Sequence, residues 1–232
     1  MRFRHADEIW RDFPALVPCA MFAVAIRPDV SVGGRLSPFT EVAKSRLAQA
    51  REAELPEIHA WRRAFAQMGL KPTQYRCAAE SLLRRFRKDG SLPRLHPLVD
   101  LCNAVSLAFA VPVAAFDVSA ITGDLEVCYA AGDEDYLTFA GELERPDPGE
   151  VIFRDQAGRA HARRWTNRQS GLSAVGDKTA AALIVAEALH ENAASDVRSL
   201  MAALTGDLAA CFGAMPDAAV LSPSAPQFAF AP

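Results

Sequence analysis

Two prolines divide the most apolar run of the chain, residues 97–118, into a helix and a strand. The run reads PLVDLCNAVSLAFAVPVAAFDV. Pro97 suits the first position of a helix, which the sequence predicts to extend to about Phe109. Pro112 cannot continue a helix, and the β-branched and apolar residues after it predict a strand over residues 113–118. A helix that leads directly into a strand restricts this chain to folds in which the two pack together.

Two polar side chains interrupt that apolar run. Asp100 and Asn103 lie within the predicted helix, where most neighbours are apolar. A polar group that is buried without a partner costs about 1–3 kcal/mol. We therefore expect Asp100 and Asn103 either to fix the backbone or to line a pocket.

The remaining elements are mostly helices first and strands afterwards. The predicted helices span residues 40–54, 56–68, 74–88, 97–109 and 196–212. The predicted strands span residues 16–26, 113–118, 125–131, 136–139, 151–155 and 161–165. This order is typical of an α+β fold, with a mixed or antiparallel sheet flanked by helices. The length corresponds to one large domain or two small ones, and we expect a single domain over residues 1–232, with a core at about 15–215.

Several segments give weaker signals. Residues 1–14 and 28–38 are predicted to be a polar entry and a loop, and residues 166–178 a polar loop. Residues 179–189 combine alanines, which favour a helix, with a central ALIV, and their position after a polar loop favours a buried strand. The C-terminal tail is either a short final strand or partly loose.

Composition restricts the possible partners and compartment. The net charge is −3, so binding of a polyanion requires a local basic face. The five cysteines are widely spaced and odd in number, which indicates buried, reduced thiols in a reducing cytoplasm. The N-terminus lacks the apolar core of a signal peptide. The longest uncharged apolar stretch, residues 104–116, is too short to cross a bilayer.

Motif searches exclude several classes of site. The five histidines have no partner at metal-ligand spacing, so we expect no metal. The sequence has no G-x-S-x-G elbow and no P-loop, and Gly33-Gly34 is read as a turn. No nucleophile triad can be named from spacing, and we expect no cofactor.

Two groups of basic residues remain. The first consists of Arg84, Arg85, Arg87, Lys88 and Arg94. The second consists of Arg159, Arg163, Arg164 and Arg168, interleaved with Trp165 and Asn167. Arginine beside an aromatic residue suits phosphate pairing and base stacking. The alternative is a solvated helix face for the first group and a solvated hairpin for the second.

Three segments together resemble a known family. Residues 93–117 resemble the B3/B4 editing domain of the phenylalanyl-tRNA synthetase beta subunit, whose pattern is similar to R-P-x-N-x-V-V-D-x-T-N-Y-x-x-x-x-x-G-Q-P-x-H-A-F-D. Val99-Asp100, Asn103, Pro112 and Ala115-Phe116-Asp117 match it in register. Free-standing members of the family are similar over about residues 15–215. They carry segments like KPTQYR, here residues 71–76, and RRWTNRQS, here residues 163–170.

The resemblance implies a pocket that hydrolyses amino acids wrongly esterified to tRNA. A free-standing version would act in trans on aminoacyl-tRNA and would contact its terminal adenosine and the attached amino acid. An ester is labile, so positioning and oxyanion stabilisation could suffice without a protein nucleophile. The chain departs from the pattern at Ala114, where the synthetase has a histidine of its editing pocket, and at Val111, where it has Gln. The histidine's loss puts tyrosine specificity in question.

The resemblance also suggests roles for individual residues. The candidate catalytic residues are Asn103, which would hydrogen-bond the substrate's amino or carbonyl group, and Asp117, which would bind its α-amino group. The alternatives are that Asn103 ties down backbone and that Asp117 caps a turn. The candidate substrate-binding residues are Arg76, Arg164, Trp165, Arg168, Gln169 and Ser170. Arg76 and Arg164 would hold the tRNA terminus or form surface ion pairs. Trp165 would stack on the terminal adenine or pack in the core. Gln169 and Ser170 would line the pocket or bond within their loop.

Three functions are consistent with the sequence. The first is a deacylase of mischarged tRNA that acts in trans. The second is a non-catalytic module that binds tRNA or RNA with the same fold, an alternative that Ala114 keeps open. The third is a pocket for a free amino-acid derivative, which the negative net charge favours. A steep loss of affinity with salt would distinguish the first two from the third.

Overall fold

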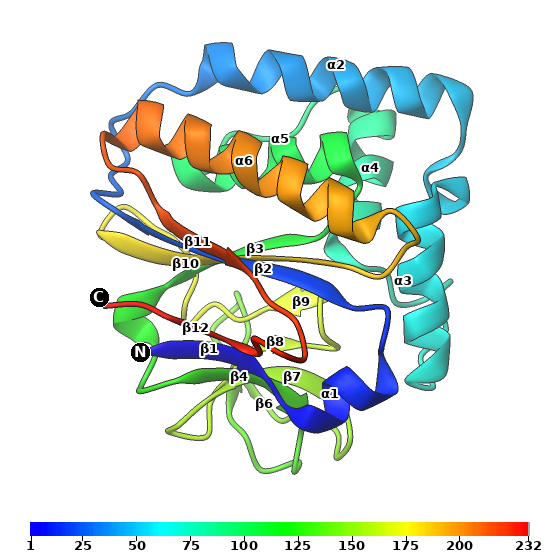
Figure 1. Cartoon of the computed structure of the whole chain (residues 1–232), viewed down its shortest axis with the longest axis vertical. Coiled ribbons are helices and arrows are strands. Elements are labelled where there is room, and N and C mark those ends of the chain that lie inside the picture. Colours follow the sequence, from blue (N-terminus) through cyan, green and yellow to red (C-terminus); the bar gives the residue numbers. More distant parts are fainter. Residues whose placement is uncertain (232) are drawn as a thin grey trace.

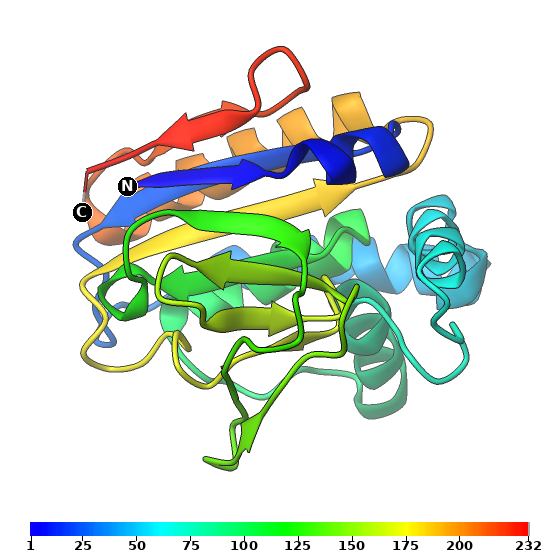
Figure 2. The ribbon, with the colours of Figure 1, turned by 90° about the horizontal axis from the view of Figure 1, so that it is seen from below.

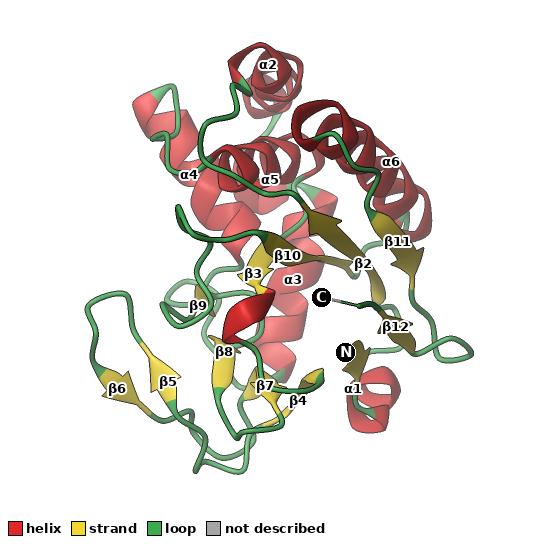
Figure 3. Cartoon of the chain, turned by 90° about the vertical axis from the view of Figure 1, so that its left-hand side faces the viewer, coloured by secondary structure: helices red, strands yellow, loops and turns green. Residues whose placement is uncertain are grey.

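A four-stranded antiparallel sheet lies in the middle of the molecule, between a layer of helices and a second sheet (Figures 1 and 3). The structure is a computed structural model that describes residues 1–231. The strand order of the central sheet is β11-β2-β10-β3. Its strands are β2 (Val17–Val24), β3 (Val113–Asp117), β10 (Ala181–Ala188) and β11 (Asp217–Val220).

The central strands are apolar on both faces because both faces are covered. In β10, Leu183 lies opposite Phe22 of β2, and the next residue, Ile184, lies opposite Met21. Side chains alternate between the faces of a strand. Leu183 and Phe22 therefore belong to the core between the two sheets, and Ile184 and Met21 to the core under the helices. This arrangement confirms the strand prediction for residues 179–189.

The helical layer packs on one face of the central sheet, and a further helix borders the second sheet. The helices are α1 (Asp7–Asp12), α2 (Gly33–Gln49), α3 (Pro56–Gln67), α4 (Ala78–Asp89), α5 (Pro97–Phe109) and α6 (Ala193–Phe212), with short 3-10 turns at Glu52–Glu54 and Val118–Ala120. Pro97 begins α5 as predicted, and the His96 side chain before it accepts a hydrogen bond from the Leu98 N–H. Helices α5 and α6 cover the central sheet, and α2 packs on the outer side of α5 (Figures 1 and 3).

The second sheet has six strands in the order β12-β1-β4-β7-β8-β9. They are β1 (Arg2–His5), β4 (Leu125–Tyr129), β7 (Val151–Asp155), β8 (Ala160–Arg163), β9 (Arg168–Gln169) and β12 (Gln227–Ala229). The pair β1 and β4 is parallel and the other pairs are antiparallel. A separate hairpin, β5 (Tyr136–Leu137) and β6 (Leu143–Glu144), extends beside this sheet (Figure 3). The predicted α+β class with a mixed sheet is confirmed.

Two predicted loops are wrong. Residues 1–14 were expected to be a polar entry, but they form β1 and α1, and Phe3 and Ile9 are fully buried. Residues 28–38 were expected to be a loop, but α2 begins at Gly33 and contains Pro38. In both segments, burial of a few apolar side chains outweighs the local preference of charged residues, glycine and proline for irregular structure.

Element ends differ from the predictions in smaller ways. Helix α4 begins at Ala78, four residues after the predicted start, and the Cys77 side chain accepts a hydrogen bond from the Glu80 N–H. Helix α6 begins at Ala193, three residues before the predicted start. The strand expected to reach Trp165 ends at Arg163. The C-terminal tail forms two strands, β11 and β12.

The cysteines are free, as predicted. Four of the five thiols are buried, and the fifth, Cys211, is partly exposed. Burial raises the pKa of Cys19 to about 12. Within residues 1–231, no helix has the length and apolar character needed to cross a membrane.

Candidate functional site

A small cleft opens between the two sheets at the level of β3 and β10. We call it the inner cleft, and its volume is about 70 Å³. Ala114 on β3 lies directly opposite Val185 on β10, and both line the cleft. The inner cleft is lined by Ala78, Pro112, Val113, Ala114, Phe153, Ala162, Trp165, Thr166, Asn167, Arg168, Gln169, Val185 and Glu187. It therefore unites the position of the missing family histidine with three predicted binding residues.

The turn between β8 and β9 forms one wall of this cleft and has a strained backbone. Arg164 and Trp165 both have positive φ, at 46° and 55°. A residue other than glycine pays roughly 1–3 kcal/mol for such a conformation, which persists only where the surroundings fix it. The carboxylate of Glu150 accepts hydrogen bonds from the Arg163 guanidinium and from the backbone N–H of Arg164, all at 2.9 Å. The backbone N–H of Trp165 donates to the Val151 carbonyl at 2.7 Å.

The ionisation of Glu150 matters for this turn. Burial raises the pKa of Glu150, but the hydrogen bonds and charge of Arg163 and the N–H of Arg164 lower it by more. The net result is a pKa below the usual value for a glutamate, so Glu150 is ionised near neutral pH. The strained turn is thus held by a charged carboxylate that is itself nearly inaccessible to water.

Trp165 lies in the core under the inner cleft. None of its surface is exposed, and its ring makes edge contacts with Trp61 and Phe13 at 5.0 and 4.8 Å between centroids. Its indole N–H lies 3.0 Å from each carboxylate oxygen of Glu187. In this conformation Trp165 offers no free face to an incoming base, which favours the core alternative that the sequence left open.

Glu187 supplies a carboxylate at the floor of the inner cleft. It is 2% exposed, and His5 Nε2 lies 2.6 Å from one of its oxygens. Sequence reasoning missed Glu187 and His5. A signal existed, because a single acidic residue within the apolar strand AALIVAEAL requires a buried partner. The β1 segment that carries His5 was read as polar and irregular, so the partner could not be recognised.

Two further polar groups of the inner cleft are fixed by bonds that cross between elements. The Gln169 side-chain amide donates to the Ala115 carbonyl of β3 at 2.7 Å. The Asn167 side-chain amide donates to the Arg76 carbonyl at 2.7 Å. These bonds orient both side chains before any ligand arrives, which is the property that binding and catalytic groups need.

The other predicted binding residues surround the cleft without all entering it. Arg76 lies beside buried Glu80 at 3.5 Å and donates to the Thr73 carbonyl. The Arg164 guanidinium stacks over the Tyr75 ring at 4.7 Å. Ser170 is fully buried and its hydroxyl donates to the Leu137 carbonyl. Ser170 therefore anchors the β5–β6 hairpin and does not line the inner cleft.

The two candidate catalytic residues lie elsewhere. Asn103 lines a separate cleft of about 220 Å³ between α2, α5 and the segment after α4. We call it the helical cleft, and its lining residues are Gly33, Leu36, Ser37, Thr40, Lys44, Phe86, Gly90, Ser91, Leu92, Pro93, Arg94, Asp100, Asn103, Ala104 and Leu107. Asp117 accepts hydrogen bonds from Ser119 and Thr179, as a turn cap does. The structure does not bring either residue to the inner cleft, and their catalytic roles stay predictions.

A second hollow adjoins the inner cleft. We call it the outer hollow; its volume is about 420 Å³, and it is lined by Tyr136, Thr138, Phe139, Ala140, Glu142, Glu144, Asn167, Arg168 and Gln169. Asn167, Arg168 and Gln169 belong to both cavities. The β5–β6 hairpin that forms its far wall carries an exposed aromatic residue, Phe139. The strand predicted over residues 136–139 is confirmed at Tyr136 and Leu137, but the sequence did not predict that Phe139 lies in the turn of a hairpin with β6.

The two basic groups are largely neutralised within the chain. Arg84 and Arg87 pair with buried Glu52 at 2.9 and 2.7 Å. In the second group, Arg163 pairs with Glu144 and Glu150. Further pairs are Arg84 with Glu80, Arg85 with Asp89, Arg94 with Asp100, Arg159 with Asp155, Arg164 with Glu150, and Arg168 with Glu144. These arginines mainly form ion pairs within the protein. Neither group as a whole is therefore a basic surface for nucleic acid, and only individual arginine side chains could contact a phosphate.

A buried chain of serine, histidine and aspartate could be mistaken for a catalytic triad. His161 Nδ1 lies 2.8 Å from the Ser173 hydroxyl, and Nε2 lies 3.2 Å from Asp155. Burial raises the pKa of Asp155, but hydrogen bonds from His161, Arg159 and Thr122 lower it well below the usual range. Ser173 and His161 are 0% exposed, so no substrate reaches them. The contacts among Ser173, His161 and Asp155 connect the β7–β8 hairpin to the loop before β10.

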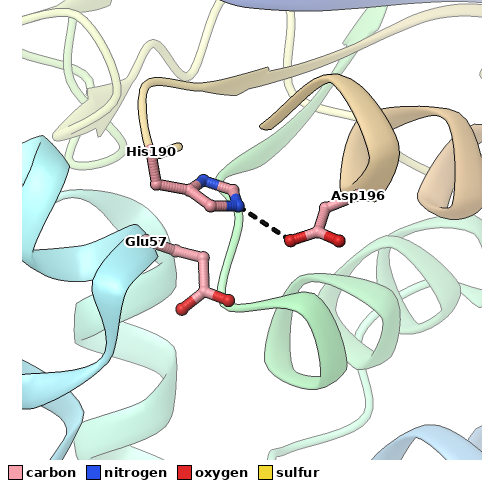
Figure 4. A group of neighbouring side chains, drawn as sticks. All are labelled: Glu57, His190 and Asp196. Carbon is pink, nitrogen blue, oxygen red and sulfur yellow. Dashed lines mark hydrogen bonds and ion pairs between the residues drawn. The ribbon is translucent and has the colours of Figure 1, made fainter. Parts of the chain in front are cut away.

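Three side chains elsewhere have atoms close enough to hold a metal ion. Within residues 1–231, they are Glu57 on α3, His190 after β10 and Asp196 on α6, with ligand atoms within 4.8 Å of one another (Figure 4). His190 Nε2 lies 2.8 Å from Asp196, and both oxygens of Glu57 accept from Arg46 at 2.7 Å. A cation would have to displace the Arg46 guanidinium from Glu57 and break the hydrogen bond between His190 and Asp196. The observed contacts connect α3 to α2, and α6 to the segment after β10.

Comparison with known proteins identifies relatives of the central part of the chain. The family model described as the B3/4 domain matches residues 60–202. The phenylalanine–tRNA ligase beta subunit of Legionella pneumophila (strain Lens) is 38% identical over 74 residues, which are 32% of this chain and 8% of that protein. The corresponding subunit of Cereibacter sphaeroides is 34% identical over 76 residues, 33% of this chain and 9% of that protein.

A solved structure is also similar. An N-terminal fragment of the phenylalanyl-tRNA synthetase beta subunit from Pyrococcus horikoshii has a TM-score of 0.49 and 10% sequence identity, covering 93% of this chain and 49% of that one. The chain matches less than a tenth of the length of the two curated relatives named above.

Proposed function

The chain belongs to the B3/4 domain family, and on this premise we propose that it hydrolyses mischarged aminoacyl-tRNA in trans, in the cytoplasm. Water would add to the carbonyl carbon of the ester that joins the amino acid to the terminal adenosine ribose. The bond from this carbon to the ribose oxygen would then break, and the ribose oxygen would take up a proton. The products are a free amino acid and an uncharged tRNA.

The observation that supports this proposal is the preformed inner cleft around Ala114. Ala114 occupies the position at which the synthetase pattern has a pocket histidine, and the cleft's polar groups converge beside it. Gln169 and Asn167 are held by bonds to β3 and to the segment before α4, and Glu187 is held by Trp165 and His5. Groups fixed in advance can position an ester and a water without reorganisation.

The chemistry of the cleft suits an aminoacyl ester. The Glu187 carboxylate at the floor attracts the ammonium group that every esterified amino acid carries. Arg168 at the mouth is 40% exposed, and its guanidinium can approach a phosphate of the tRNA terminus. The reaction needs no protein nucleophile, because the ester is labile and the water can be positioned by hydrogen bonds.

The size of the cleft restricts the amino acid. A protein cavity of about 150 Å³ accommodates benzene, and the inner cleft, at about 70 Å³, is half as large. An aromatic side chain therefore does not fit without displacement of the walls. We propose that the substrates carry small side chains, such as those of glycine, alanine or serine.

Deacylation of a panel of mischarged tRNAs tests the proposal. We expect release of small amino acids well above the spontaneous rate, and little release of tyrosine. Gln169→Ala should slow the release about tenfold or more, because it removes a fixed group from the cleft wall. Gln156→Ala, a glutamine on the exposed β7–β8 turn, is the matched control. No release above the spontaneous rate from any tRNA would reject the hydrolase.

The internal pairing of the arginines favours a second candidate, a pocket for a free amino-acid derivative. Few of the basic side chains that would contact a polyanion are unpaired. Salt distinguishes the candidates, because phosphate contacts make affinity fall steeply with ionic strength. Hydrolysis of simple aminoacyl esters with no salt dependence and no binding of tRNA would favour this second function.

A further inference from the structure

The outer hollow is a continuation of the inner cleft. Both cavities are lined by Asn167, Arg168 and Gln169, so a ligand that passes these residues touches both. The outer hollow is about 420 Å³ and the inner cleft about 70 Å³. A molecule with a large part and a small part would fit this pair of cavities, with the large part outside.

The far wall of the outer hollow presents an aromatic ring to solvent. Phe139 is 73% exposed at the tip of the β5–β6 hairpin, which projects from the body of the molecule (Figure 2). Leu143 on the same hairpin is 72% exposed, but it does not line the hollow. An exposed aromatic ring beside a hollow is a stacking surface for a nucleobase, and every base has a face that can use it.

The hairpin is held in place, which makes the ring's position definite. The Tyr136 hydroxyl donates to the Gln169 carbonyl at 2.8 Å, and Ser170 and Gly171 both donate to the Leu137 carbonyl. A Cβ added to Gly171 would lie 2.9 Å from the Thr138 carbonyl oxygen. The residues after β9 therefore hydrogen-bond to and pack closely against the first strand of the hairpin, which fixes the position of the outer hollow relative to the inner cleft.

The charges in the hollow favour a nucleoside over a run of phosphates. Its lining contains one guanidinium, that of Arg168, and two carboxylates, those of Glu142 and Glu144. Arg168 lies over the Tyr136 ring at 5.4 Å and contacts Glu144 at 3.1 Å. Carboxylates accept hydrogen bonds from ribose hydroxyls and from exocyclic amines, and they repel phosphates. The single arginine can serve one phosphate at most.

We propose that the outer hollow binds the 3′-terminal adenosine of aminoacyl-tRNA, with the adenine stacked on Phe139 and the ester directed into the inner cleft. This inference rests on the proposed function, because it names the part of the substrate that the neighbouring surface takes. It transfers the stacking role that the sequence suggested for Trp165, which is buried, to an exposed ring on the same side of the cleft.

The first test compares two exposed apolar residues of one hairpin. Phe139→Ala should weaken binding of an unacylated CCA-terminated tRNA about tenfold, within the range that loss of one base–aromatic stack produces. Leu143→Ala, equally exposed but outside the hollow, should change it less than twofold. Phe139→Tyr should restore the affinity. Equal losses in the two alanine variants would overturn the proposal in favour of a general apolar surface for a protein partner.

The second test does not require activity. A Phe139→Trp variant places an exposed indole at the hollow, whereas the three native tryptophans, Trp10, Trp61 and Trp165, are buried. A short single strand ending in CCA should quench the new fluorescence, and the same strand lacking the terminal base should not. Quenching without deacylation would reject the proposed hydrolase and keep the nucleoside site. Equal quenching by both strands, or none by either, would overturn the nucleoside site whether or not tRNA is deacylated.

Discussion

The inner cleft and the helical cleft differ in how their polar side chains are held. In the helical cleft, Thr40 bonds to the Ser37 carbonyl and Lys44 to Glu41, each within one turn of α2. In the inner cleft, Gln169 bonds across to β3, and Trp165 bonds across to Glu187 on β10. Bonds between distant segments fix geometry, whereas bonds within one helix leave the side chain free to turn. This preorganisation is the reason for placing the proposed function in the inner cleft.

The comparison also shows how a sequence motif can be divided by the fold. Asn103 and Ala114 stand eleven residues apart in the matching pattern, yet Asn103 lies on α5 in the helical cleft and Ala114 lies on β3 in the inner cleft. Helix α5 packs on one face of the central sheet, and the inner cleft opens on the other. Nearness in a motif did not place the two side chains in one pocket.

The largest effect is expected from the carboxylate under the inner cleft. Glu187→Ala leaves the imidazole of His5 and the indole N–H of Trp165 buried without their partner, and each buried polar group left unsatisfied costs about 1–3 kcal/mol. Urea denaturation should show this loss in the free energy of unfolding. Glu142→Ala, at an exposed position of the outer hollow, should cost less than about 0.5 kcal/mol. Similar small losses in both variants would mean that the inner cleft has no such network.

A smaller effect is expected where the hairpin meets the residues after β9. Gly171→Ala places a Cβ 2.9 Å from the Thr138 carbonyl oxygen, and overpacking of this kind costs about 1–3 kcal/mol. Gly176→Ala is the matched control, because nothing lies within 4 Å of a Cβ there. We expect a change within about 0.5 kcal/mol for the control. If the two variants unfold at the same urea concentration, Gly171 does not pack closely against Thr138 of the hairpin.

The smallest effect is expected from acid. The pKa of Glu150 is lowered in the folded protein, so its stabilisation is present above the unfolded value of about 4.3 and is lost as the pH falls. The free energy of unfolding should therefore decrease with falling pH below about 4, and Glu150→Gln should show a shallower decrease. The protection factors for amide exchange in the Arg164–Trp165 turn should fall in the same range. An unchanged pH dependence in the variant would contradict the role given to Glu150.

The sequence predicted those parts of the fold that depend on local signals. Proline at the first helical position located α3 and α5, and short apolar runs bounded by turn residues located β2, β4 and β7. The segments that form β1 and α1 carry charged residues whose burial is set by partners far away in the chain. His5 contacts Glu187, which is 182 residues distant. No local pattern specifies such a contact.

The candidate site was predicted in part. The sequence singled out Arg168, Gln169 and Ala114, which line the inner cleft. It could not show that Arg164 and Trp165 adopt left-handed conformations, because neither residue favours positive φ. That turn directs the Trp165 side chain inward, and the same residue in an extended strand would point according to the strand's alternation. The burial of Trp165 thus depends on Glu150, whose importance no motif indicated.

The central claim is that the inner cleft, and not the helical cleft, carries the activity. One added side chain in each cleft tests it: Ala114→Leu fills the inner cleft, and Thr40→Leu fills the helical cleft from an equally half-buried position. Single-turnover deacylation of a small mischarged aminoacyl-tRNA should fall about a hundredfold in Ala114→Leu, as expected when the reacting groups are displaced. Thr40→Leu should stay within about threefold of the unmodified chain. A hundredfold loss in Thr40→Leu with normal activity in Ala114→Leu would contradict the account and return the active site to Asn103.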